Sequence, residues 1–204
     1  METPKPKLAK LLESIIAGER PTNVDLSNCE LDTLPLELLL LADCLEVLNL
    51  GGNNLCDLPP EMILFKKLRI LFFAQNKFEY IPEVLGQIPT LYMLSFKSNM
   101  LRVVSPQSLS PSLGWLILTD NAIESLPPTI GNLTPLRKLM LAGNRLRSLP
   151  PELERCRDLE LLRIANNQLE SLPRWLLLMP KLAWIAFAGN PLGAEFNHVS
   201  SDSE

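Results

Sequence analysis

The chain repeats one pattern of apolar residues along most of its length. The pattern is LxxLxLxxNxLxxLP, and its clearest copy runs from Leu136 to Pro150. Other copies follow at spacings of 22 or 23 residues, whereas a degenerate first copy begins at Pro21. Units of this length cannot bury their apolar residues alone, so they stack on one another into an elongated domain. We therefore expect eight stacked repeats over residues 21–192, starting near residues 21, 45, 68, 91, 113, 136, 159 and 182.

The ninth position of the pattern is asparagine in every repeat except the first, where it is Cys29. An asparagine side chain both donates and accepts hydrogen bonds, so inside a stack it can satisfy backbone groups where a strand turns into a loop. Cysteine replaces it only weakly, which suits a terminal repeat. We expect these hydrogen bonds to backbone groups from Asn53, Asn76, Asn99, Asn121, Asn144, Asn167 and Asn190.

Each repeat is expected to contribute one short strand. Leucines at positions four and six alternate with other residues, which is the period of a strand whose positions three, five and seven face outward. The Leu-Pro pair at positions fourteen and fifteen starts the return of the chain, because proline favours a loose or short helical segment over a second strand. Parallel strands should therefore line a concave face, and the returns should form the convex face.

The fourth repeat departs from this pattern over residues 103–111. This segment lacks the Leu-Pro pair and is rich in serine and proline, and its repeat has only 22 residues. We expect an irregular loop there, which is either a tolerated irregularity or a docking feature.

Two non-repeating segments flank the repeats. Residues 1–20 predict a short helix that ends near Gly18 and covers the first repeat as an N-terminal cap. The alternative is an amphipathic helix for a membrane or a partner. Residues 193–204 end in polar and acidic residues, and we expect a C-terminal cap and polar tail there. The apolar face of the helix is predicted from the spacing of Leu8, Leu11, Leu12, Ile15 and Ile16.

Composition argues against several classes of protein. A net charge of −4 and a pI near 5.2 give no support for a nucleic-acid-binding surface. The longest leucine run, 38–41, is far shorter than the roughly 20 apolar residues that span a membrane. No secretion signal follows the first lysines. Since the cysteines form no CxxC pair, we expect reduced thiols in a cytoplasmic protein at Cys29, Cys44, Cys56 and Cys156.

The whole of residues 21–192 resembles intracellular leucine-rich-repeat proteins of the Leu-Pro-rich type, whose repeats have roughly 23 residues. The resemblance implies an α/β solenoid, in which the chain winds into a curved right-handed superhelix. It also implies a parallel β-sheet on the concave face and an N-terminal helical cap. Because this group includes Ras-pathway scaffolds, the resemblance further implies a signalling protein that binds other proteins.

Four segments resemble, more narrowly, the repeats that precede the kinase domain in leucine-rich-repeat protein kinases. They are residues 111–121, 136–144, 159–167 and 182–191. The Gly-rich phosphate loop, the HRD motif and the DFG motif of a kinase do not occur in this sequence. Two alternatives follow: the chain is the recognition or regulatory region of a longer kinase, or it is a stand-alone relative.

The sequence offers no catalytic constellation. Its one histidine, His198, lies in the tail, so a His-based triad and a multi-histidine metal site are not available within one chain. The carboxylates of Glu46, Asp120 and Glu160 fall in separate repeats, and we expect them to be solvated surface charges. We therefore expect no enzyme activity, no cofactor and no metal.

Outward positions three and five of the predicted strands carry many apolar residues. With strands about 4.8 Å apart, eight of them give a face about 34 Å long, and an apolar stripe of that size usually marks an interface. We predict a monomeric, non-catalytic interaction module or scaffold that binds a protein or peptide there. The alternatives are an unoccupied apolar face, self-association, and a tail that folds Phe196 over Trp184. The predicted binding residues are Ile70, Phe72, Met93, Trp115, Ile117, Met140, Leu161, Arg163 and Trp184.

Basic residues of the sixth repeat indicate a second kind of contact. A phosphopeptide or an acidic protein is the partner that such residues would bind, and solvated surface charge is the alternative. The residues of this predicted acidic-partner patch are Arg137, Lys138 and Arg145, with Arg147 nearby in the sequence.

Overall fold

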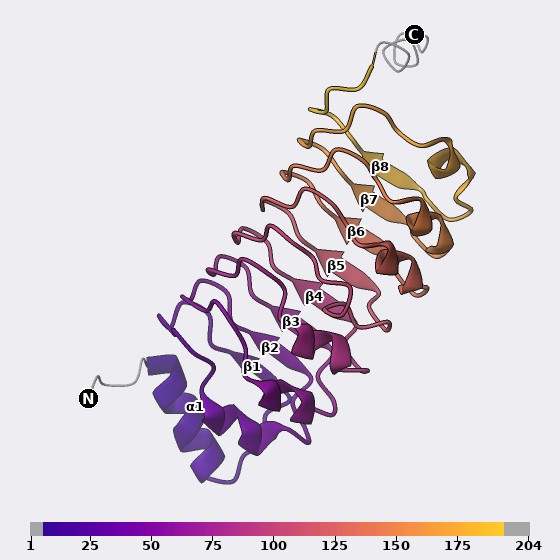
Figure 1. Cartoon of the computed structure of the whole chain (residues 1–204). Coiled ribbons are helices and arrows are strands. Elements are labelled where there is room, and N and C mark those ends of the chain that lie inside the picture. Colours follow the sequence, from indigo (N-terminus) through magenta and orange to yellow (C-terminus); the bar gives the residue numbers. More distant parts are fainter. Residues whose placement is uncertain (1–5, 194–204) are drawn as a thin grey trace, which may run out of the picture.

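The computed structural model describes residues 6–193 as one curved stack of repeats (Figure 1). Eight parallel strands form a single sheet in the order β1 to β8, so each strand pairs only with the strands of adjacent repeats. The expected solenoid with a parallel sheet is confirmed. The strands are β1 (Asn23–Asp25), β2 (Val47–Asn49), β3 (Ile70–Phe72), β4 (Met93–Ser95), β5 (Trp115–Ile117), β6 (Lys138–Met140), β7 (Leu161–Arg163) and β8 (Trp184–Ala186).

Every strand begins at the third position of its repeat, and neighbouring strands pair position by position. Asn23 pairs with Val47 at one end of the sheet, and Leu161 pairs with Trp184 at the other. The central residue of each strand from β1 to β7 is buried, because alternate strand residues point to opposite faces. The register therefore places all outward residues of one position in a single row across the sheet.

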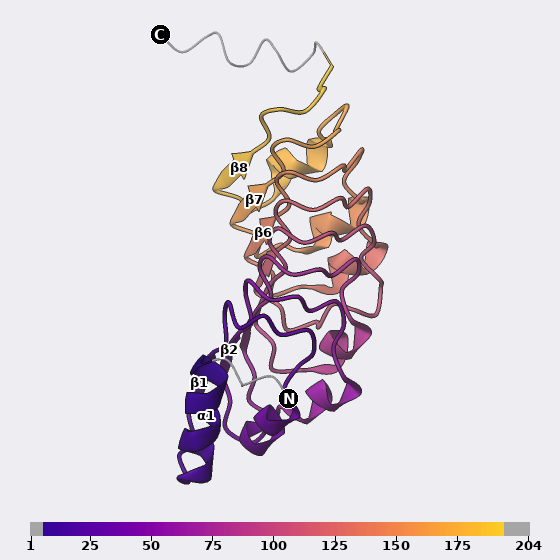
Figure 2. The same cartoon turned by 90° about the vertical axis from the view of Figure 1, so that its left-hand side faces the viewer.

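Short 3-10 helices lie on the side of the coil opposite the sheet (Figure 2). Each follows directly after a proline, whose restricted φ and missing N–H suit the entry to a helical turn. Residues 103–111 of the fourth repeat form turns and bends instead, as expected for an irregular loop. The 3-10 helices are η1 (Leu36–Leu41), η2 (Pro60–Leu64), η3 (Glu83–Gln87), η4 (Pro128–Asn132), η5 (Pro151–Arg155) and η6 (Arg174–Leu178).

The core is a continuous column of apolar side chains between the sheet and these returns. Phe73, Phe78 and Phe96 pack against one another with ring centroids 4.9 to 5.1 Å apart, and each such pair adds about 0.5–1.5 kcal/mol to the effect of burial. Cys29 and Cys156 are buried in this core. Burial raises the pKa of the Cys156 thiol to about 11, so this thiol is protonated at neutral pH.

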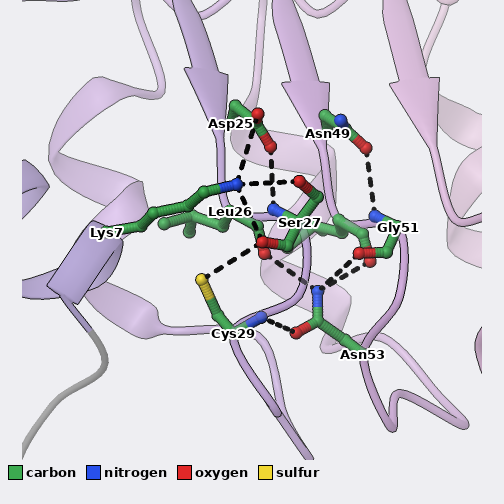
Figure 3. Close-up of polar contacts among 9 residues, drawn as sticks. Lys7, Asp25, Leu26, Ser27, Cys29, Asn49, Gly51 and Asn53 are labelled. Atoms are coloured by element: carbon green, nitrogen blue, oxygen red, sulfur yellow. Dashed lines mark hydrogen bonds and ion pairs between the residues drawn. The ribbon is translucent and has the colours of Figure 1, made fainter.

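The ninth-position asparagines bind the backbone of two repeats at once, and we call them the asparagine ladder. Asn144 Nδ2 donates to the carbonyl oxygens of Leu118 and Leu141 at 2.9 and 3.0 Å. Its Oδ1 accepts a hydrogen bond from the Ile123 N–H at 3.0 Å. Asn53 makes the corresponding bonds between the first two repeats (Figure 3). The same pattern recurs at Asn76, Asn99, Asn121, Asn167 and Asn190.

The residue before each ladder position has a left-handed backbone in all eight repeats. The eighth position has φ between +52° and +75°, from Asn28 in the first repeat to Gly189 in the last. Three of these residues are glycines that follow an Asn or Asp at the same position of the preceding repeat. A Cβ on Gly52 would lie 2.1 Å from Asn28 Oδ1, and the pairs Gly143 with Asp120 and Gly189 with Asn166 give 2.5 and 2.2 Å. The Asn or Asp side chain therefore fills the space where the next repeat lacks a Cβ.

Helix α1 (Pro6–Ile16) packs on the core through Leu8, Leu11 and Ile15, as expected for an N-terminal cap. Leu12 is half-buried. Ile16 is 85% exposed, so its predicted place on the buried face is wrong. The reason is geometric, because each helical residue is rotated by about 100° from the one before it, which turns the last residue of α1 away from the core.

Lys7 ties α1 to the first strand through polar contacts (Figure 3). Its Nζ donates to the backbone oxygen and to Oγ of Ser27, each at 2.9 Å, and lies 3.4 Å from Asp25 Oδ2. Hydrogen bonds from Ser27, and then the charge of Lys7, lower the pKa of Asp25. These contacts hold the cap over the end of the stack.

Several predictions fall on residues 1–5 and 194–204, which lie outside the described part of the chain. They concern the C-terminal cap and tail, His198, and the fold-back of Phe196. Over residues 6–193, no helix is long and apolar enough to cross a membrane.

The asparagine ladder predicts a large loss of stability for Asn144→Ala. This change removes three hydrogen bonds and leaves the buried groups of Leu118, Leu141 and Ile123 without these partners. We expect the free energy of unfolding in urea to fall by about 2–4 kcal/mol. Asn132→Ala, at an exposed residue at the end of η4, is the matched control and should change it by less than about 0.5 kcal/mol. Equal losses in the two variants would contradict the role of the ladder.

Candidate functional site

The concave face carries the predicted binding residues in two rows that cross the sheet from β3 to β8. We call these two rows the concave stripe. Within each row, neighbours are register partners of adjacent strands, about 4.8 Å apart. The first row contains Ile70, Met93, Trp115, Lys138, Leu161 and Trp184, and the second contains Phe72, Ser95, Ile117, Met140, Arg163 and Ala186. The structure thus brings all nine predicted residues onto one face, and their role in binding stays a prediction.

Most apolar side chains of the stripe are only half-buried, because each is flanked by its neighbours in the row. Trp184 is 61% exposed, since β8 is the last strand of the sheet. Ser95 is only 4% exposed and separates Phe72 from Ile117 in the second row. The apolar surface therefore narrows at β4 to Met93, so the stripe is less continuous than the sequence suggests.

Lys138 belongs to the stripe through a contact with Trp115. Its Nζ lies 3.7 Å from the centroid of the Trp115 ring, and the two residues are register partners on β5 and β6. A cation–π contact at an exposed site contributes about 0.5–1 kcal/mol. The centre of the face thus combines a large aromatic ring with a positive charge.

The two arginines of the predicted acidic-partner patch differ in their surroundings. The Arg137 guanidinium donates two hydrogen bonds to Glu160 Oε1, at 2.9 Å from Nε and 2.6 Å from Nη2. These bonds, and then the charge of Glu160, raise the pKa of Arg137. Arg145 follows the opposite end of β6, beyond the turn that contains Asn144. The charge of Arg137 is therefore already compensated by Glu160, and the acidic-partner patch stays a prediction.

A contact at the edge of the concave face is not evident from the repeat pattern. A Cβ on Gly114 would lie 2.1 Å from the Tyr92 ring, so this ring occupies the space that the glycine leaves. A hydrogen bond that the Arg137 guanidinium donates to the Tyr92 side chain also contributes to the raised pKa of Arg137. The sequence could have indicated this contact through the repeat register, because Tyr92, Gly114 and Arg137 hold the second position of three successive repeats.

The described residues contain no group of three or more His, Cys, Asp or Glu side chains that could hold a metal ion. Glu46 and Asp120 are exposed and lie in different repeats from Glu160, which is paired with Arg137. The concave face therefore offers apolar, aromatic and charged contacts to a partner.

Comparison with known families agrees with this geometry. Models of the leucine rich repeat match residues 134–192 and 44–64. The matched segments are leucine-rich repeats, and the chain has the leucine-rich-repeat fold. This repeat fold is generally a non-catalytic interaction fold.

The chain is similar to parts of longer proteins. It is 39% identical over 117 residues to the probable serine/threonine-protein kinase pats1 of Dictyostelium discoideum, over 52% of this chain and 4% of the kinase. The structure of a Leptospira interrogans LRR protein matches 94% of this chain and 66% of its own, with TM-score 0.55 and 26% identity.

A plant receptor gives a further structural match. The LRR ectodomain of the membrane receptor kinase GASSHO1/SCHENGEN3 from Arabidopsis thaliana, solved in complex with CASPARIAN STRIP INTEGRITY FACTOR 2, matches 82% of this chain and 24% of its own. The TM-score is 0.68 and the identity is 25%. The chain thus spans a small part of both kinases.

The contact between Trp115 and Lys138 predicts a measurable energetic coupling. In a double-mutant cycle of Trp115→Leu and Lys138→Met, urea unfolding should give a coupling free energy of about 0.5–1 kcal/mol. The matched cycle pairs Trp115→Leu with Arg145→Met and should give a coupling free energy near zero. Arg145 lies in the chain beyond the C-terminal end of β6. A coupling near zero for Lys138 as well would show that the cation does not interact with the ring in solution.

Proposed function

We propose that this leucine-rich-repeat protein is a non-catalytic, cytoplasmic interaction module or scaffold that binds a protein or peptide across the concave stripe as a monomer. One observation carries the proposal: apolar residues of six consecutive strands are aligned in register on the open face of one sheet. An aligned apolar surface of this kind is typical of an interface.

The stripe is also suited to binding because its positions are preorganised. Its residues stand on hydrogen-bonded strands, of which β3 to β7 have a neighbour on both sides and β8 pairs with β7, so little backbone ordering is needed when a partner binds. Tryptophan, tyrosine and arginine are the residues that most often dominate the binding energy of interfaces. On this basis we assign Trp115, Trp184 and Arg163 as the main anchors.

The similar proteins support a protein or peptide as the ligand class. The matched plant ectodomain was solved in complex with CASPARIAN STRIP INTEGRITY FACTOR 2, and repeat solenoids generally use their concave surface for binding. The partner itself would be selected by outward residues, which vary between solenoids of the same core pattern.

The proposal predicts that Phe72→Ala combined with Trp115→Ala weakens partner binding without unfolding the protein. Affinity capture from a cell extract, followed by mass spectrometry, would identify partners of the wild-type protein. Titration of the purified partner should then show an affinity at least about tenfold lower for the double variant, because interface anchors contribute about 2 kcal/mol or more.

Leu36→Ala combined with Leu40→Ala is the matched control, because it removes two exposed apolar side chains from η1, outside the sheet. Circular dichroism and urea unfolding should show that both double variants are folded. Unchanged affinity in a folded Phe72 and Trp115 double variant would rule out the stripe as the interface.

The kinase relative favours a second candidate function. Identity of 39% over 117 residues to pats1 supports a role as the recognition or regulatory region of a leucine-rich-repeat kinase. In that case the coding sequence should continue past codon 204 into a Gly-rich loop, an HRD motif and a DFG motif. Sequencing of the full transcript would check this, and a stop codon directly after Glu204 would exclude a kinase domain that follows the repeats.

A further inference from the structure

A hollow of about 460 Å³ lies outside the sheet, at the junction of the second and third repeats. Its walls come from the segments that lead into η2 and η3 and from the helices themselves. These segments lie on the side of the coil opposite the strands (Figure 2). The hollow is therefore distinct from the concave stripe, and we call it the acidic groove.

The apolar part of the acidic groove is exposed. Ile63 and Tyr80 line it and are 47% and 46% exposed, respectively. Val103, which is 62% exposed, extends this surface because it forms a parallel β-bridge with Tyr80. Side chains from three consecutive repeats thus form one apolar surface along the groove.

The repeat architecture does not require these apolar residues. Tyr80 and Val103 hold the thirteenth position of the third and fourth repeats, and the same position is serine in the later repeats, at Ser125, Ser148 and Ser171. The later repeats fold with a small polar residue there, so the exposed ring and the exposed valine are local features of this part of the stack.

The groove also has one sign of charge. Asp57 and Glu83 line it, and none of its lining residues is lysine or arginine. Ser105, from the irregular segment of the fourth repeat, donates a hydrogen bond to Glu83 Oε1 and so orients that carboxylate. By contrast, a hollow of similar size beside η5 is lined by both Glu152 and Arg155.

An apolar wall beside two carboxylates matches the chemistry of a lysine or arginine side chain. The aliphatic stem of such a residue packs on apolar surface, while its charged end remains near acceptors. A carboxylate accepts charge-assisted hydrogen bonds from an ammonium or guanidinium group. The adjacent exposed surface of Tyr80 and Val103 would accept a second, apolar side chain.

We propose that the acidic groove binds a linear peptide of a partner protein in which lysine or arginine lies next to a bulky apolar residue. The cation enters the groove near Asp57 and Glu83, and the apolar residue packs on Tyr80 and Val103. The irregular fourth repeat has a role in this site, because it supplies both Val103 and the serine that orients Glu83. Binding here leaves the concave stripe free.

The test is a selection of random twelve-residue peptides displayed on phage against the wild-type protein. Peptides that are enriched should carry lysine or arginine beside an aromatic or branched aliphatic residue. Fluorescence polarisation with the synthetic peptides should then give an affinity at least tenfold lower for Tyr80→Ser and for Asp57→Asn combined with Glu83→Gln. The affinity of the wild-type protein should also fall between 50 and 500 mM NaCl, because salt screens exposed charges.

Two matched variants separate this site from others. Glu124→Gln removes one exposed carboxylate outside the groove and should leave affinity unchanged, as should Phe72→Ala combined with Trp115→Ala on the concave stripe. Tyr80→Ser introduces the residue that three other repeats have at this position, so it should fold. If it does not, the Asp57 and Glu83 variant remains an independent test.

Three outcomes would overturn the proposal. Enrichment of no peptide, or of peptides without a basic residue, would contradict the assigned ligand chemistry. If the peptides bind the groove variants with the affinity of the wild-type protein but bind the stripe variant more weakly, their site is the concave face instead. Concentration-dependent mass in light scattering that Tyr80→Ser abolishes would show that a second copy of the chain occupies the groove.

Discussion

The rest of the structure depends on the hydrogen bonds of the asparagine ladder. Each turn out of a strand leaves backbone groups inside the stack, where water cannot satisfy them. One short amide binds carbonyl groups of its own repeat and of the preceding one, and it accepts an N–H as well. A leucine at this position would fill the volume but leave those groups unpaired, at a cost of about 1–3 kcal/mol each. Because the same bonds recur from repeat to repeat, they set the relative position of the strands and hence the straight rows of the concave stripe.

Once the ladder and the inward leucines hold the stack together, the remaining positions are free to vary. The concave stripe uses positions three and five, whereas the acidic groove uses the thirteenth position and the helices that follow it. The two surfaces therefore lie on different sides of the coil and have different chemistry. The stripe is apolar with added cations at Lys138 and Arg163, and the groove is apolar with the carboxylates of Asp57 and Glu83. The two proposed binding sites are therefore separate, since neither surface shares a residue with the other.

The sequence predicted the features that recur in every repeat. It missed the contacts that depend on side-chain packing between repeats. Strand positions, inward leucines and the ladder asparagines follow from a period that many copies share, so errors in one copy do not obscure it. The pairing of Arg137 with Glu160 and the contact of Lys138 with Trp115 depend on rotamers of exposed residues, which a pattern does not specify. The left-handed eighth position had a compositional signal, since Gly, Asn, Asp and Ser dominate it. Ile16 was misplaced because it lies about 100° around the helix from Ile15, at the margin of the apolar face.

The packing at the eighth position makes the order of the repeats directional. Asn28, Asp120 and Asn166 each occupy space that is free only because the following repeat has glycine there. A duplicated unit with Asn or Asp at this position, inserted after itself, would place a Cβ where that side chain already lies. A duplicated glycine unit would meet no such obstacle. The repeats are therefore not interchangeable, because each is packed to fit the repeats beside it. Lengthening of the chain by gene duplication or by design would be tolerated at some junctions and would cause steric clashes at others.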